Sequence, residues 1–145
     1  MKKLSLLNEG HVIFVSIGFY VASLFQDCVY VYGSDPRAWV PGWCLLLWGW
    51  IGLIFAGYVA WMANPLLCVS WFLIGRKYYK ISLYFSLLAF VLMLSFLFYG
   101  NLVTRDDLSV SKISGYGYGY FFWLLSSFVL VVAGAFKVYH DRATQ

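Results

Sequence analysis

Long stretches without a charged side chain are the feature that most constrains this chain. Four such windows cover residues 10–26, 38–75, 81–104 and 113–136. The hydrocarbon core of a bilayer is ~30 Å thick and is crossed by about 20 apolar helical residues, so each window is long enough, or nearly so, to cross it. Only 11% of the 145 residues are charged, whereas roughly a quarter are charged in an average soluble domain. The sequence therefore predicts a membrane protein and excludes a water-soluble monomer.

The windows predict an all-α membrane protein that forms one domain over residues 1–145. We expect a bundle of four transmembrane helices at about 11–31, 43–63, 81–100 and 117–137. An outer-membrane β-barrel would alternate apolar and polar residues, and stretches such as VLMLSFLFYG do not alternate. The residues before Cys28 offer no small-residue cleavage site, so we expect the first helix to remain in the mature protein.

The second window is too long for one crossing. Its 38 residues would form a helix of about 57 Å, nearly twice the thickness of the hydrocarbon core. We expect the chain to bend at Asn64-Pro65, because proline lacks a helical N–H donor. Residues 66–74 are then predicted to lie along the inner membrane interface. A broken helix whose freed carbonyls bind an ion or a substrate is the functional alternative.

The basic residues predict the orientation of the bundle. Seven of the ten lie before the first helix, between the second and third, or after the fourth, and three lie in the other loops. The seven are Lys2, Lys3, Arg76, Lys77, Lys80, Lys137 and Arg142, and the three are Arg37, Arg105 and Lys112. Positive residues favour the cytoplasmic side, so both termini are predicted to be cytoplasmic in a bacterial inner membrane. The net charge of +4 is explained by this bias and by anionic lipid, and we expect no nucleic-acid partner.

Small residues on the second predicted helix indicate a packing face. Gly52, Ala56 and Ala60 recur every four residues, which is the spacing that lets two helix backbones approach closely in lipid. We therefore expect this face to contact another helix of the bundle.

Polar residues on the first helix, together with the polar residue at the predicted bend, are the candidate binding residues. Ser16, Tyr20, Ser23 and Asp27 fall on one helical stripe, and Asn64 precedes the proline. Asp27 is the only acidic residue inside a predicted span, and intramembrane carboxylates are usually functional. The favoured alternative is structural: an ion pair or solvated cap for Asp27, and helix packing for the serines.

The cysteines and glycines add smaller signals. Cys28 and Cys44 lie near the outer ends of two consecutive predicted helices, where an oxidising compartment allows a disulfide, and Cys68 is left on the inner side. The Gly-Tyr repeat over residues 115–120 leads into the fourth helix or forms an extended loop, and we favour the first. His11 has no second ligand at a metal-binding spacing, so we expect no metal site and no cofactor.

Residues 42–71 read GWCLLLWGWIGLIFAGYVAWMANPLLCVSW. This stretch resembles a group of small uncharacterised bacterial membrane proteins that share a Gly-Trp pair followed by Trp-x-Ala-Asn-Pro-Leu. The resemblance implies a bacterial origin and a four-helix plan, and it brings no activity with it.

Two functional hypotheses follow from the sequence. The preferred one is a non-catalytic protein that binds another membrane protein or a toxin, as an accessory subunit or an immunity protein. The second is a small transporter or channel that assembles as an oligomer around Asp27, Asn64 and the serine stripe. We prefer the first because transport of a polar solute usually needs more intramembrane polarity than these helices carry.

Overall fold

The computed structural model describes residues 8–32, 39–103 and 110–143. In these residues the chain is mostly helical, with an antiparallel sheet of four strands. The α-helices are α1 (Glu9–Leu24), α2 (Gly42–Ala56), α3 (Ala63–Gly75), α4 (Tyr79–Ser95) and α5 (Tyr118–Ala143), and the short 3-10 helices are η1 (Val59–Met62) and η2 (Phe96–Phe98). The strands are β1 (Asp27–Val31), β2 (Trp39–Pro41), β3 (Asn101–Val103) and β4 (Val110–Tyr116).

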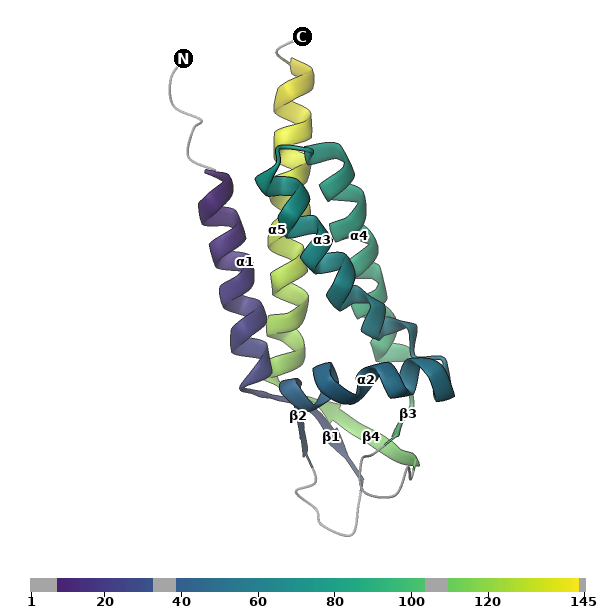
Figure 1. Cartoon of the computed structure of the whole chain (residues 1–145). Coiled ribbons are helices and arrows are strands. Elements are labelled where there is room, and N and C mark those ends of the chain that lie inside the picture. The colour runs from purple at the N-terminus through teal and green to yellow at the C-terminus, as the bar shows by residue number, and fades with distance from the viewer. Residues whose placement is uncertain (1–7, 33–38, 104–109, 144–145) are drawn as a thin grey trace.

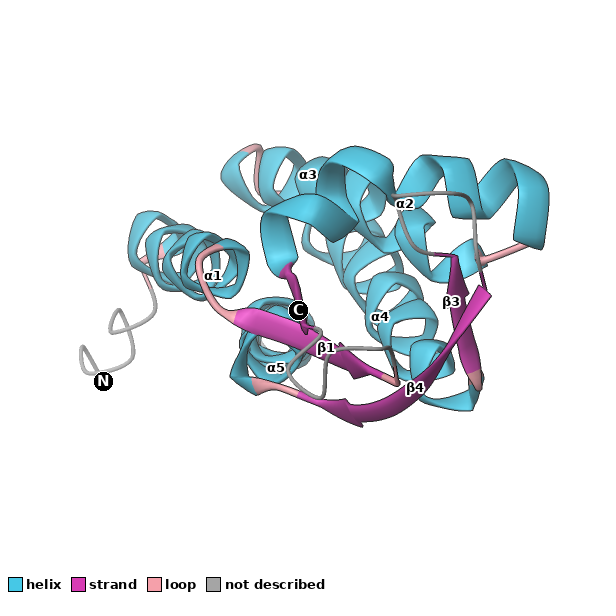
Figure 2. Ribbon diagram, turned by 90° about the horizontal axis from the view of Figure 1, so that it is seen from below, coloured by secondary structure: helices cyan, strands magenta, loops and turns pink. Residues whose placement is uncertain are grey.

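Helices α1, α3, α4 and α5 run side by side as a bundle, with the start of α1 and the end of α5 at the same end of it (Figure 1). The sheet and α2 lie at the other end, and α2 runs across the direction of the bundle. Figure 2 views the molecule from that end and shows the strands crossing the end of the bundle, with α2 beside them. The predicted helical bundle is thus confirmed in its coarse form, whereas the sheet and the transverse helix were not predicted.

Two segments are long and apolar enough to cross a membrane by length and composition: Tyr79–Phe98 and Tyr118–Asp141. The other apolar helices among the described residues are shorter and cover Glu9–Leu24, Gly42–Ile54 and Val59–Gly75. The bundle therefore combines two full-length apolar helices with two shorter ones, α1 and α3, the second extended by η1.

The predicted second helix over residues 43–63 is wrong. Helix α2 ends at Ala56 and is capped by Gly57, whose φ of 67° lies in the left-handed region that favours glycine. The chain therefore turns seven residues before Asn64-Pro65. Pro65 instead lies in the first turn of α3, where a missing N–H breaks no helical hydrogen bond. Residues 66–74 belong to α3, a helix of the bundle, and are not a separate extension after the second helix.

Two glycines of α2 explain how the chain after this helix folds back against it. A Cβ added to Gly49 would lie 2.5 Å from Cδ1 of Trp61, and one added to Gly52 would lie 2.6 Å from Cδ2 of Tyr58. Only glycine leaves room for these rings against the helix. Gly52 and Ala56 lie on α2 whereas Ala60 lies on η1, so the predicted single face of small residues does not exist.

The first predicted helix ends at Leu24 and not at residue 31, because the chain continues as a strand. β1 is the second strand in the order β2-β1-β4-β3, and Val29 pairs with Val40 of β2 and Tyr116 of β4. Residues 28–31 read Cys-Val-Tyr-Val, and β-branched and aromatic residues of this kind favour strands. Val29 and Val31 are buried and Tyr30 is exposed.

The Gly-Tyr repeat is divided between two elements. β4 ends at Tyr116 and α5 begins at Tyr118, so the repeat is neither an extended loop nor only a lead into the helix. The amide of Gly117 donates to the carbonyl of Cys28 at 2.9 Å, and a Cβ at Gly117 would collide with the carbonyl of Asp27. Glycine is therefore needed where α5 starts against β1.

Burial in the bundle differs from that in a soluble protein, because serines are buried beside the apolar core while large apolar side chains are exposed. The buried polar residues of the described chain are all serines except Asn64. Large apolar side chains are exposed around every bundle helix, among them Phe14, Phe72, Tyr84, Val91 and Phe128. Soluble proteins rarely expose apolar surface on this scale, whereas small and polar side chains at helix contacts are typical of bundles in lipid.

Candidate functional site

Asn64 is the centre of the most extensive polar contact in the bundle. It lies in the first turn of α3 and is 9% exposed. Its Oδ1 accepts hydrogen bonds from Trp123 Nε1 at 3.0 Å and from Tyr20 Oη at 3.3 Å, while its Nδ2 donates to the carbonyl of Trp61 at 3.1 Å. One amide thus connects α1, η1 and α5 to α3.

A cavity of about 70 Å³ adjoins this contact, where the bundle meets α2 and the sheet. Its lining includes Tyr20, Ser23 and Asn64 from the bundle and Tyr58 and Trp61 from the turn after α2. Most of the lining is apolar. A space of this size holds a few water molecules or a small apolar group.

The structure brings together three of the five candidate binding residues: Tyr20, Ser23 and Asn64. Ser16 does not line the cavity; its hydroxyl donates to the carbonyl of Ser126 at 2.6 Å and accepts from Trp71 Nε1 at 2.8 Å. Asp27 is the first residue of β1, is half-buried, and does not line the cavity either. It therefore lies in the sheet and not in a helix, contrary to the prediction.

The buried serines hold helices to one another. The hydroxyls of Ser70 and Ser82 lie 3.0 Å apart and join α3 to α4, and Ser127 donates to the carbonyl of Ser86 at 2.9 Å and joins α5 to α4. No buried side-chain nitrogen or oxygen of the described residues lacks a hydrogen-bond partner. These contacts agree with the packing alternative for the serines.

All three cysteines lie in the described part of the chain, and no disulfide joins Cys28 to Cys44. The Cys28 thiol is buried and donates to the carbonyl of Ser23 at 3.7 Å. A Cβ at Gly119 would lie 2.6 Å from its Sγ, so α5 packs closely over this thiol. The bridge that the sequence allowed is not formed, and Cys68 is exposed on α3.

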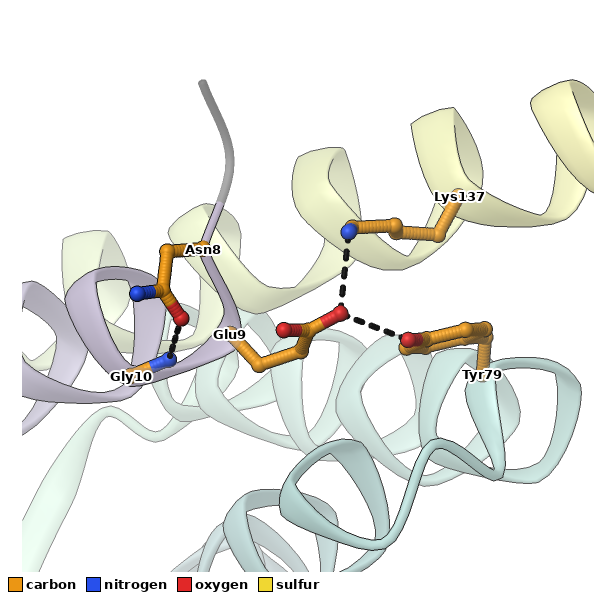
Figure 3. Close-up of polar contacts among 5 residues, drawn as sticks. All are labelled: Asn8, Glu9, Gly10, Tyr79 and Lys137. Atoms are coloured by element: carbon orange, nitrogen blue, oxygen red, sulfur yellow. Dashed lines mark hydrogen bonds and ion pairs between the residues drawn. The ribbon is translucent and has the colours of Figure 1, made fainter. Parts of the chain in front are cut away.

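An ionic contact closes the opposite end of the bundle (Figure 3). Glu9 Oε1 accepts from Tyr79 Oη at 2.6 Å and from Lys137 Nζ at 3.0 Å, so α1, α4 and α5 meet at one carboxylate. The Tyr79 hydrogen bond, followed by a backbone hydrogen bond and the Lys137 contact, lowers the pKa of Glu9 from 4.5 to about 2. Asn8 caps α1 by accepting the Gly10 amide at 3.1 Å.

Glu9 was not among the residues selected from the sequence. Tyr79 and Lys137 are 70 and 128 residues away along the chain, so no local spacing connects them to Glu9. The basic residues of the outer loops, Arg37, Arg105 and Lys112, were the candidate ion-pair partners of Asp27. Arg37 and Arg105 lie outside the described residues, and Lys112 is exposed on β4. Among the described residues, no group of three or more His, Cys, Asp or Glu side chains is arranged to hold a metal ion.

No protein-family model matches the chain, and comparisons with curated proteins and with solved structures found no significant similarity.

Proposed function

We propose that this is a multi-pass protein of the bacterial inner membrane, with α1, α3, α4 and α5 crossing the bilayer. The burial pattern carries the proposal: serines fill helix contacts beside the apolar core, while large apolar side chains face outward. Both long helices meet the length and hydropathy of a membrane span. The basic turn around Arg76 and Lys77 lies at the same end of the bundle as the start of α1 and the end of α5, in agreement with a cytoplasmic location for this end.

We further propose that the protein acts by binding another membrane protein or a toxin, as an accessory or immunity protein, and not by catalysis. Exposed aromatic side chains of the sheet, at the end of the bundle opposite the basic turn, support this role. Tyr30 is 39% exposed, Tyr32 65%, and Trp39 54%. Tyr30 and Trp39 are neighbours on adjacent strands, so their rings share one side of the sheet edge. Exposed tyrosine and tryptophan are the residues most enriched at the centres of protein interfaces.

Site-specific photo-crosslinking in intact cells tests this binding surface. A benzophenone amino acid in place of Trp39 should form a product of discrete, higher mass that contains a second protein. The same group in place of Tyr84, an exposed residue of α4 in the bundle, is the matched control and should form lipid adducts only. Tyr30→Ala should weaken the product at position 39. If the group at position 39, like that at position 84, forms lipid adducts and no protein product, the aromatic residues are membrane anchors and the proposal is wrong.

The cavity beside Asn64 favours transport as the second candidate, because it places Tyr20, Ser23 and Asn64 around one space. The apolar core of the bundle argues against a continuous polar path from this cavity, since Leu67, Met93 and Leu130 are fully buried in that core. Purified protein in liposomes distinguishes the two functions. A flux of ions or small solutes that is lost in Asn64→Leu, with the fold retained, would favour the transporter, whereas no flux above that of empty liposomes favours the binding protein.

A further inference from the structure

The transverse helix α2 carries an uncovered apolar stripe. Residues 42–56 contain no charged side chain. Trp43, Leu47, Trp50 and Ile54 follow one another at the spacing of a single helical face, and their exposed fractions are 44%, 57%, 44% and 65%. The opposite side of α2 is occupied, because Gly49 and Gly52 seat the rings of Trp61 and Tyr58. A helix that is apolar all round is normally surrounded by protein core or by lipid.

The level of α2 within the molecule follows from its start. The Gly42 amide donates to the carbonyl of Gln26 at 3.1 Å, and a Cβ at Gly42 would collide with the carbonyl of Ser23. Helix α2 therefore begins at the level where α1 ends. From Glu9 to that level, the 16 residues of α1 extend about 24 Å.

This length places α2 relative to a bilayer. The charged contact between Glu9 and Lys137 fits the inner edge of a hydrocarbon core that is ~30 Å thick. The start of α2 then lies about 6 Å inside the outer edge of that core. Helices that lie in a membrane interface bury their apolar face about 5–10 Å deep, and tryptophan is enriched at that depth.

We propose that α2 is an interfacial helix embedded in the outer leaflet, and that its stripe of Trp43, Leu47, Trp50 and Ile54 contacts lipid acyl chains. This assignment rests on the proposed membrane location of the bundle. It accounts for the short α1: the transverse helix and the bundle together fill the outer leaflet where α1 does not reach. Phe98 of η2, at the same end of the bundle, is also an exposed large apolar side chain, as expected where this end contacts lipid.

Quenching of tryptophan fluorescence by brominated lipids tests the assignment in the reconstituted full chain. Trp50→Phe should remove a quenched component, and this component should be larger with bromine near the glycerol end of the acyl chain than near its methyl end. The matched control is Trp39→Phe, because Trp39 lies on β2 and is exposed to a similar degree. Its removal should leave the lipid-quenched signal unchanged and should lower quenching by aqueous iodide.

Two results would overturn the assignment. If the Trp50 component is quenched by iodide and not by brominated lipid, the stripe faces water. If brominated lipid quenches it only after the lipid-to-protein ratio is raised, a second copy of the chain covers the stripe. Failure of the membrane location itself looks different, because no tryptophan of the protein would then be quenched by brominated lipid.

Discussion

The carboxylate of Glu9 joins three helices that are distant in sequence, and its removal should loosen the end of the bundle. Glu9→Gln keeps the shape and removes the charge that Tyr79 and Lys137 contact. We expect a loss of about 1 kcal/mol in the free energy of unfolding, because the ion pair is partly exposed. Thermal unfolding in detergent measures the loss. In a double-mutant cycle, Tyr79→Phe should cost less in the Glu9→Gln background than in the parent; equal costs would contradict the contact.

The same carboxylate predicts a pH dependence. The folded protein holds the pKa of Glu9 at about 2, below its ordinary value of 4.5. A lowered pKa contributes stability that is fully present above the ordinary value and is lost as the pH falls through the folded value. The difference in melting temperature between the parent and Glu9→Gln should therefore be largest above pH 5 and should shrink as the pH approaches 2. A difference that stays constant over this range would rule out the lowered pKa.

Two glycines in similar helices should respond to alanine in opposite directions. A Cβ at Gly49 meets the ring of Trp61, which is held by a hydrogen bond from its Nε1 to the carbonyl of Leu46 at 2.9 Å. Because that ring cannot move freely, Gly49→Ala should destabilise the protein by about 1–3 kcal/mol. Gly18 in α1 has open space around it, so Gly18→Ala should stabilise by roughly 0.5–1 kcal/mol. Thermal unfolding followed by near-ultraviolet circular dichroism measures both. A Gly49→Ala variant as stable as the parent would refute the close approach at Gly49, and destabilisation by Gly18→Ala would refute the open space at Gly18.

At the scale of elements, Asn64 holds the start of α3 against its neighbours. Asn64→Leu would leave the buried donors Trp123 Nε1 and Tyr20 Oη without their acceptor. An unsatisfied buried donor costs about 1–3 kcal/mol, so we expect a loss in that range or somewhat above it. Trp123→Phe removes one donor and should recover part of the loss in the double variant. Additive losses, measured by denaturant or thermal unfolding, would contradict the shared contact.

Element by element, the sequence predicts the bundle helices better than their connections. Residues 81–95 and 118–136 lie in predicted and observed helices, because each stretch is apolar, uncharged and long. The strand β1 was merged with the first helix, since Cys28 to Val31 are apolar like the window that ends at residue 26, and only their valine and tyrosine content favours a strand. A window without charged residues indicates that a segment can contact lipid, and it gives no information on the direction of the helix. It therefore does not distinguish a helix that crosses the membrane from one that lies across the bundle, as α2 does.

The candidate site was predictable in part for the same reason. The polar stripe of α1 includes Tyr20 and Ser23, which line the cavity beside Asn64, because helical spacing alone puts them on one face. Their joining to Asn64 depends on the turn at Gly57, and that turn depends on Gly49 and Gly52 receiving aromatic rings. Small residues at every third or fourth position have the same spacing whether a helix or an aromatic ring packs against them. The spacing in α2 therefore predicted a helix as the packing partner, whereas the structure has aromatic rings there.

At the scale of the whole molecule, the bundle has one end with charged contacts and one end with a layer of sheet and transverse helix (Figure 1). Glu9, Tyr79 and Lys137 meet at the first end, so α1 must start on the same side of any membrane as the turn between α3 and α4. The proposed four crossings require this arrangement. If only the two longest apolar helices crossed, β1 and β2 would be left on the cytoplasmic side and β4 on the other, so β1 could not pair with β4.

Labelling of introduced cysteines in intact cells separates these arrangements. Asn8→Cys and Tyr78→Cys place exposed thiols at the end with the charged contacts, Tyr32→Cys places one directly after β1, and Ser114→Cys places one on β4. With four crossings, a membrane-impermeant maleimide should label Tyr32→Cys and Ser114→Cys directly, and the other two only after permeabilisation. The parent chain sets the background from its own cysteines. Labelling of Tyr32→Cys only after permeabilisation, with Ser114→Cys still labelled directly, would leave α4 and α5 as the crossing helices. The pairing of β1 with β4 could then not form in the cell, and both the bundle and the depth assigned to α2 would have to be given up.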